Sequence, residues 1–203
     1  MSKQTLYSKR ANFVLGFNGC DQSVVEKVLG GKEVLNESTN DYDWLGHGVY
    51  FWENNKERAL EFAVESSKRS NSTIKKPSVV GAVIDLGYCM DLVDSEFLNE
   101  LKDAYSTLKI TFDLIEKPLP ENTGDSPDKL LRKLDCAVIE TAHEINKDTI
   151  PFDSVRGVFW EGEPLYPGAT FSMNNHIQIC IRTPNCIKGF FLPKEINEDY
   201  VNP

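Results

Sequence analysis

Asn40-Asp41-Tyr42-Asp43-Trp44-Leu45-Gly46-His47-Gly48-Val49-Tyr50-Phe51-Trp52 is the stretch on which the fold assignment of this chain depends. Two glycines flank His47, and the apolar run from Val49 to Trp52 predicts a short strand. The rings of Trp44, Tyr50 and Trp52 offer flat faces on which an aromatic ligand can stack. We expect Trp52 in the core and Tyr50 in a binding site. The structural alternative places both rings in the core and His47 in a simple turn.

Outward from this stretch, apolar spacing predicts strands near both ends of the chain and helices between them. Asp21 and Asn54 are predicted helix N-caps, the latter in a capping box with Glu57, and Pro127 suits the first turn of a late helix. The expected strands are 13–17, 49–52, 78–86, 155–160, 176–181 and 187–192, and the expected helices are 21–29, 54–65, 94–116 and 127–146. This pattern indicates the α+β class, with helices inserted in the middle of the chain.

The composition fits one domain spanning residues 1–203. Hydrophobic residues make up 40% and charged residues 26%, as in ordinary globular proteins, and no apolar run approaches the roughly 20 residues that cross a bilayer. The polar start of the chain has no export signal, so we expect a cytoplasmic protein with no membrane partner. Only three histidines are present, none at ligand spacing to a cysteine, so we predict no metal site.

Two further motifs lie on either side of the central stretch. Gly16-Phe17-Asn18-Gly19-Cys20-Asp21 leads a strand through a glycine turn into a helix, where free backbone groups can bond a planar amide. Taken alone, this motif is better explained as an ordinary strand–helix turn. Late in the chain, the loop after Trp160 leads into a strand on which His176 and Gln178 share one face. That face lines either a pocket or an exposed side of the sheet.

Together the three motifs resemble the ADP-ribosyltransferase superfamily, in its poly(ADP-ribose) polymerase-like branch. Members of this superfamily build an NAD cleft from a strand ending in His-Gly, a Gly-x-Gly-x-Tyr-Phe segment and a late strand that usually carries glutamate. Here Asn18-Gly19 stands at the first place, residues 46–51 at the second, and His176 or Gln178 at the third. The resemblance spans roughly the whole chain and is closest over residues 43–63, a region similar to small bacterial transferase-like proteins. It implies split mixed or antiparallel sheets around the NAD cleft.

The resemblance also implies roles for individual residues. The backbone of Gly19 would hold the nicotinamide carboxamide, Tyr50 would stack on the nicotinamide ring, and Asn18 would bond the adenine-side ribose. The third-motif residue would bond the nicotinamide ribose and steady its developing positive charge. The implied catalytic residues are Asn18, Tyr50, Gln178, His176 and Glu161, and the implied NAD-binding residues are Asn18, Gly19, Cys20, Gly48, Tyr50, Asp43 and His47.

The chain departs from the family pattern at two of these places. Asn18 stands where the pattern has histidine; asparagine still donates and accepts hydrogen bonds, but it is shorter and has no imidazole. No glutamate stands on the late strand, and Gln178 has no charge with which to stabilise an oxocarbenium-like transition state. In one interpretation Glu161 or Glu163, in the preceding loop, supplies the missing carboxylate. In the other, both are solvated loop residues.

Strand alternation makes the third motif more specific. It places His176, Gln178 and Cys180 on one face of the late strand and three isoleucines, at 177, 179 and 181, on the other. We expect the isoleucine face in the core and the polar face in the cleft, with Gln178 opposite Tyr50. Elsewhere, Asp43 and Asp41 either touch a ribose or cap their turn, and His143 is expected to be structural.

The expected function is NAD-dependent mono-ADP-ribosyl transfer to a protein or nucleic-acid acceptor, in a bacterial toxin or anti-phage effector. NAD is the substrate, and an antitoxin or other regulatory protein is the expected partner. A net charge of −9 repels nucleic acid at long range but leaves room for a local basic groove. Two alternatives stay open: a catalytically silent module that binds NAD, ADP-ribose or a partner, and an NAD glycohydrolase that uses water as acceptor. The departures at positions 18 and 178 also fit weak activity, a different acceptor or a disabling substitution introduced at Asn18.

Overall fold

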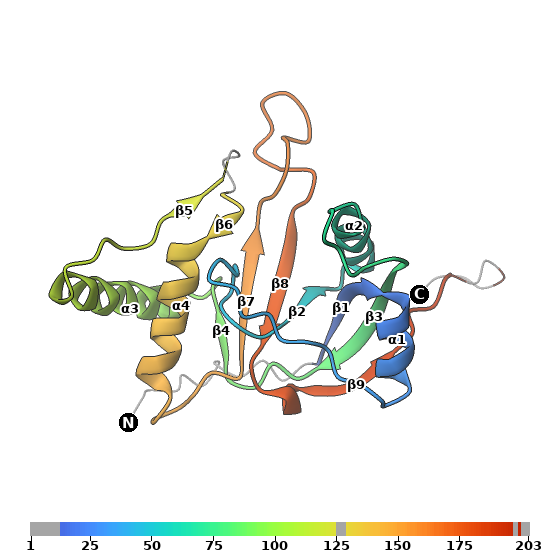
Figure 1. Ribbon diagram of the computed structural model, residues 1–203, viewed down its shortest axis with the longest axis horizontal. Helices are drawn as coiled ribbons and strands as arrows, with labels where there is room; N and C mark the ends of the chain where they lie inside the picture. Colours follow the sequence, from blue (N-terminus) through green and yellow to red (C-terminus); the bar gives the residue numbers. More distant parts are fainter. Residues whose placement is uncertain (1–12, 125–128, 197–198, 200–203) are drawn as a thin grey trace.

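The computed structural model describes residues 13–124, 129–196 and 199, and Figure 1 shows how their helices and strands are arranged. Within them, seven strands form one mixed sheet in the order β4-β7-β8-β2-β1-β3-β9, and β5 and β6 form a separate two-stranded ribbon. The elements are β1 (Val14–Asp21), α1 (Gln22–Leu29), β2 (Val49–Glu53), α2 (Lys56–Ser67), β3 (Pro77–Ile84), β4 (Cys89–Asp91), α3 (Ser95–Leu114), β5 (Asn122–Thr123), β6 (Leu131–Arg132), α4 (Lys133–Asn146), β7 (Ser154–Phe159), β8 (His176–Ile181), the 3₁₀ helix η1 (Pro184–Cys186) and β9 (Ile187–Phe191). The predicted α+β class is confirmed.

The N-terminal helix caps agree with the sequence in one case and differ in the other. Asp21 caps α1 as predicted, because its side chain accepts a hydrogen bond from Ser23 N. The predicted cap of α2 is wrong by one residue, since Asn55 Oδ1 accepts from Arg58 N while Asn54 adopts a left-handed backbone conformation, φ 51°. The capping-box pattern located the helix but not the residue that begins it.

The start of α4 is later than the sequence indicated. Residues 131–132 pair with β5 as β6, so the helix begins only at Lys133. The backbone of Leu134 then donates to Asn122 Oδ1, which lies on β5 and takes the place of a local cap. Pro127, the predicted first-turn residue, lies outside the described part of the chain.

The expected split of the sheet is not observed, although β1 and β2 come close to it. The two strands share only two register pairs, Gly16 with Glu53 and Phe17 with Trp52, whereas β1 pairs with β3 over its whole length. Beyond Phe17 the Asn18 side chain spans the two strands by donating to a backbone oxygen of β2. The sheet is therefore continuous, because the first half of β1 stays hydrogen-bonded to β2.

Both faces of the central strands are buried. Phe51 and Ile179 face one side and pack with Val25 of α1, while Cys180 faces the other and packs with residues of α3 and α4. Figure 1 shows α1 and α2 beside β1 and β3, and α3 and α4 beside the β4–β7 edge. On the predicted isoleucine face, Ile179 and Ile181 are core as expected, whereas Ile177 is only half-buried. The opposite face is also largely covered, because helices pack on it.

The longest described helix, α3, has 20 residues and buries Phe97, Ala104 and Leu108 on one side. Lys102 and Lys109 lie exposed on its other sides. Among the residues that the structure describes, no helix combines the length and the apolar character that crossing a membrane requires.

Candidate functional site

Three segments that are far apart in the sequence meet on the adjacent strands β1, β2 and β8 (Figure 1). Tyr50 pairs with Cys180 and Trp52 with Gln178, while Phe17 pairs with Trp52 on the other side of β2. Because directly opposed residues share a face of the sheet, all five side chains lie on one face. The prediction that Gln178 stands opposite Tyr50 is wrong: the register places it opposite Trp52, two residues further along β2.

Asn18 and Gly19 lie within β1, where they pair with Val80 and Val79 of β3, and α2 packs tightly against them. A Cβ on Gly19 would lie 2.0 Å from the Ala59 carbonyl oxygen, so only glycine allows α2 to come this close. The half-buried Asn18 donates from Nδ2 to Tyr50 O at 2.9 Å. Burial and the neighbouring Asp21 carboxylate raise the pKa of Cys20 to about 11, which keeps its thiol neutral. The predicted glycine turn is wrong, because β1 continues to Asp21, which caps α1 directly. The NAD contacts of these residues stay a prediction.

The hydroxyl of Tyr50 holds the glycine-rich loop of the central stretch. It donates to Gly46 O at 2.6 Å and accepts from Leu45 N at 2.9 Å. Gly46 has φ +73°, a left-handed conformation that favours glycine. Burial raises the pKa of Tyr50, so the phenol stays protonated. Tyr50 therefore anchors the loop, while its stacking on a ligand is not tested by this geometry.

His47 belongs to a polar cluster with Glu140 of α4 and Arg182 just after β8. The backbone N–H of His47 donates to Glu140 Oε1 at 2.7 Å. Arg182 Nη1 donates to the backbone oxygen of His47 at 3.0 Å and to Glu140 Oε1 at 2.6 Å. Burial acts to raise the pKa of Glu140, but the His47 N–H and the Arg182 guanidinium outweigh it and leave the pKa lowered. Next to His47, Gly48 is buried, and a Cβ there would lie 2.5 Å from Ile181 O.

Asp43 and Asp41 hold the loop that precedes this cluster. Asp43 accepts from Asn40 N at 2.9 Å and from Asn40 Nδ2 at 3.2 Å, so it caps its turn. Asp41 pairs with Lys133 at 2.8 Å. A cavity of about 220 Å³ opens beside them, lined by Asp41, His47, Pro120, Lys133, Cys136, Ala137 and Glu140. For Asp43, the structural alternative accounts for the observed contacts.

His176 lies at the base of the β7–β8 hairpin, and its side chain is fully buried. Its ring packs among Phe159, Trp44 and Trp52, with centroid separations of 5.6, 6.2 and 6.4 Å. Nδ1 lies 2.6 Å from Asn174 O. Because a carbonyl oxygen only accepts, Nδ1 must carry the proton and Nε2 must present a lone pair. Among the described residues Nε2 has no hydrogen-bond partner.

An ion pair stands beside this imidazole. Glu161 Oε2 lies 3.6 Å from His176 Nδ1 and 2.9 Å from Nη2 of Arg58, whose side chain is only 5% exposed. Burial lowers the pKa of His176, and this outweighs the Asn174 carbonyl and the Glu161 carboxylate, so the ring is neutral near pH 7. The loop carboxylate considered as a substitute for the missing glutamate is thus next to His176. Among the residues that the structure describes, no ion pair stands beside Gln178, which is half-buried opposite Trp52.

Arg58, in the helix predicted over residues 54–65, was not among the candidate site residues that the sequence indicated. The missed signal is a charged residue next to Ala59 and Ala63, which are fully buried on the same helix. A second buried arginine was also missed. Arg156 of β7 bonds Glu53 of β2 at 2.5 Å and Asp91 of β4 at 3.2 Å, so it ties three strands together.

His143, expected to be structural, lies buried on α4 with its ring edge-on to Phe152, 5.8 Å between centroids. Burial, followed by the Arg182 charge, lowers the pKa of His143 to about 4. Within the described residues, no group of three or more His, Cys, Asp or Glu side chains is placed to hold a metal ion.

Comparison with known proteins adds one relative. The chain is 27% identical over 193 residues to the uncharacterized protein MJ0359 of Methanocaldococcus jannaschii, an alignment that covers 85% of this chain and 83% of that protein. No family model matches the chain. No solved structure matches it either.

Proposed function

We propose that this protein is an NAD-dependent mono-ADP-ribosyltransferase whose site lies around His176, on the face of the sheet that carries Tyr50 and Trp52. The single observation that supports this most is that β1, β2 and β8 are adjacent. The three motifs of the resemblance are far apart in sequence, and a transferase site requires them to be neighbours.

Within the third motif, we favour His176 over Gln178 as the ribose-binding residue. The neutral imidazole presents a buried Nε2 lone pair, which can accept a hydrogen bond from a ribose hydroxyl. Glu161 behind it supplies the negative charge that a neutral ring lacks. Arg58 holds that carboxylate at 2.9 Å, so its charge and orientation are maintained inside the protein.

The chemistry then follows from NAD itself. The bond between nicotinamide and ribose breaks with its electron pair leaving on nicotinamide, and the acceptor nucleophile bonds the same ribose carbon and gives its proton to water. Glu161, acting through His176, stabilises the positive charge that develops on the ribose. A protein side chain or a nucleic-acid base serves as the acceptor, consistent with a toxin or anti-phage role controlled by a partner protein.

A specific observation favours a second candidate, the catalytically silent binding module. His176 is enclosed by aromatic rings, and the Tyr50 hydroxyl is used by the protein's own loop. A ligand reaches His176 only if one of the surrounding rings moves. Binding of NAD or ADP-ribose without release of nicotinamide would identify this module.

The deciding experiment incubates the purified protein with labelled NAD, alone and with whole-cell lysate, and follows free nicotinamide and label on protein or nucleic acid. Transfer of label supports the transferase, and nicotinamide release without an acceptor identifies a glycohydrolase. Glu161→Gln should lower the rate at least tenfold, whereas Glu163→Gln, an exposed residue of the same loop, should not. Absence of both chemistry and saturable NAD binding rejects the proposal.

A further inference from the structure

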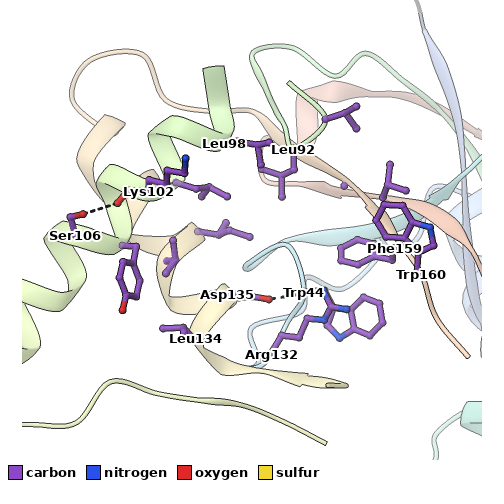
Figure 2. A pocket seen from close by; sticks show the side chains of 17 residues that line it. Trp44, Leu92, Leu98, Lys102, Ser106, Arg132, Leu134, Asp135, Phe159 and Trp160 are labelled. Carbon is purple, nitrogen blue, oxygen red and sulfur yellow. Dashed lines mark hydrogen bonds and ion pairs between the residues drawn. The ribbon is translucent and has the colours of Figure 1, made fainter. Parts of the chain in front are cut away.

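A cavity of about 890 Å³ lies between α3, the start of α4 and the β4–β7 edge of the sheet (Figure 2). This volume falls in the range of small-molecule sites, roughly 300–1,000 Å³. Most of its wall is apolar, and the aliphatic residues in it include Leu92, Leu98, Leu101, Leu134, Val138 and Ile139. None of the three motifs predicted this hollow.

The aromatic end of the cavity is occupied by a side chain of the protein, that of Arg132. The Arg132 guanidinium lies 4.2 Å from the Trp44 ring centroid and 5.0 Å from that of Phe159. Figure 2 shows Arg132 beside the Trp44 ring, with Asp135 nearby, 4.0 Å from the guanidinium. Since a cation already covers a face of each ring and itself faces a carboxylate, this end favours neither a cationic nor a stacking ligand.

The α3 side of the cavity has a different charge balance. Lys102 is exposed on that wall, and among the described residues its ammonium group makes no recorded hydrogen bond or ion pair. Ser106 one turn later donates to the Lys102 backbone oxygen and leaves the ammonium unaffected. A positive group at the rim of an aliphatic hollow matches a ligand with an apolar body and one anionic end, and it stands out in a chain of net charge −9.

We propose that this cavity binds an elongated aliphatic carboxylate of the fatty-acid class, with the chain along the leucines of α3 and α4 and the carboxylate at Lys102. This site does not depend on the transferase proposal, because it uses neither His176 nor Asn18 and Gly19 of β1. The protein only binds this ligand and catalyses no reaction on it. The apolar walls bury the hydrocarbon chain, and the Lys102 ammonium pairs with the carboxylate.

The first test titrates octanoate, decanoate and dodecanoate, each below its micelle-forming concentration, into the full chain by calorimetry. Affinity should rise roughly fourfold for each buried methylene until the cavity is full. Trp44 and Trp160, two of the three tryptophans, line the cavity, so their fluorescence should change on binding. No saturable binding of any member of the series overturns the proposal.

Matched variants locate the site. Lys102→Glu should weaken decanoate about fivefold and leave 1-decanol unchanged, whereas Lys109→Glu, exposed on the same helix but absent from the cavity wall, should change neither. Leu98→Trp should weaken both ligands by filling the cavity. Equal weakening by the two lysine variants would show a general charge effect and overturn the site. If sedimentation shows a dimer that Leu98→Glu dissociates and that does not bind decanoate, the cavity surface is instead an interface between two copies of the chain.

Discussion

Two regions of this protein invite comparison, the sheet face around His176 and the hollow beneath α3 and α4. In the first, the chain fills the space itself: Arg58 and Glu161 pair inside the protein, and Trp52 is only 4% exposed. In the second, apolar walls surround a cavity of about 890 Å³. The region where the three motifs meet is therefore densely packed, and the cavity, to which the central stretch contributes only Trp44, is open. The comparison shows that a motif identifies residues that belong together without showing whether a ligand has room among them.

The largest effect expected in the filled region comes from Gly19→Ala. A Cβ would lie 2.0 Å from the Ala59 backbone oxygen, and a helix backbone cannot rotate away as a side chain can. We expect a loss of about 3 kcal/mol or more in the free energy of unfolding, measured with urea. Gly189→Ala in β9 is the control, since its Cβ meets nothing within 4 Å and should stabilise by up to about 1 kcal/mol. Similar values for the two variants would mean that α2 does not approach β1 this closely.

Tyr50→Phe tests whether Tyr50 serves the loop or a ligand. The change leaves Gly46 O and Leu45 N without their hydroxyl partner, so we expect a loss of about 2 kcal/mol in unfolding free energy. Tyr42→Phe, at an exposed position, should be nearly neutral. If NAD binds by stacking, Tyr50→Phe keeps the affinity that Tyr50→Ala loses. Unchanged stability in Tyr50→Phe would exclude the anchoring role.

A pH effect is expected from two buried histidines, His176 on the filled sheet face and His143 on α4, away from the cavity wall. The pKa of His143 is lowered from its ordinary value near 6.5 to about 4, and that of His176 is lowered as well. The neutral rings therefore stabilise the fold above about pH 6.5, and this stability is lost as the pH falls toward the folded pKa. We expect His143 to account for a loss of roughly 1 kcal/mol between pH 7.5 and 5.5, and His143→Gln to remove that share. An unchanged pH slope in the variant would show that burial of His143 does not control it.

The smallest effect is expected at the open cavity. Leu98 lines it but is 43% exposed, so Leu98→Ala should cost less than about 1 kcal/mol. Leu108→Ala, on the buried side of the same helix, should cost about 2–5 kcal/mol. Urea unfolding of both variants measures the difference. Comparable losses would mean that the cavity is closed in solution, which would also weaken the case for a ligand there.

Local chemistry made most of the elements predictable. The strands at 154–159, 176–181 and 187–191 were located within a residue or two, because alternation and apolar runs are encoded by neighbouring residues. Asp21 was correct as a cap for the same reason. The start of α4 was missed, because β5 and Asn122 determine it from a distance. A local capping pattern in the sequence cannot reveal a hydrogen-bond partner that only the tertiary fold brings close.

The sequence by itself determined the α+β class and the order of most of the elements, because periodicity and helix caps depend on residues close along the chain. That the three motifs should be neighbours was implied only by the resemblance to a known superfamily. Only the tertiary structure decided that Gln178 faces Trp52, that Glu161 meets His176 and Arg58, and that α3 and α4 leave a hollow against β7. Register depends on which strands pair, and burial depends on which helices cover them. Both are set by long-range packing, in which a shift of two residues moves a side chain to a different neighbour.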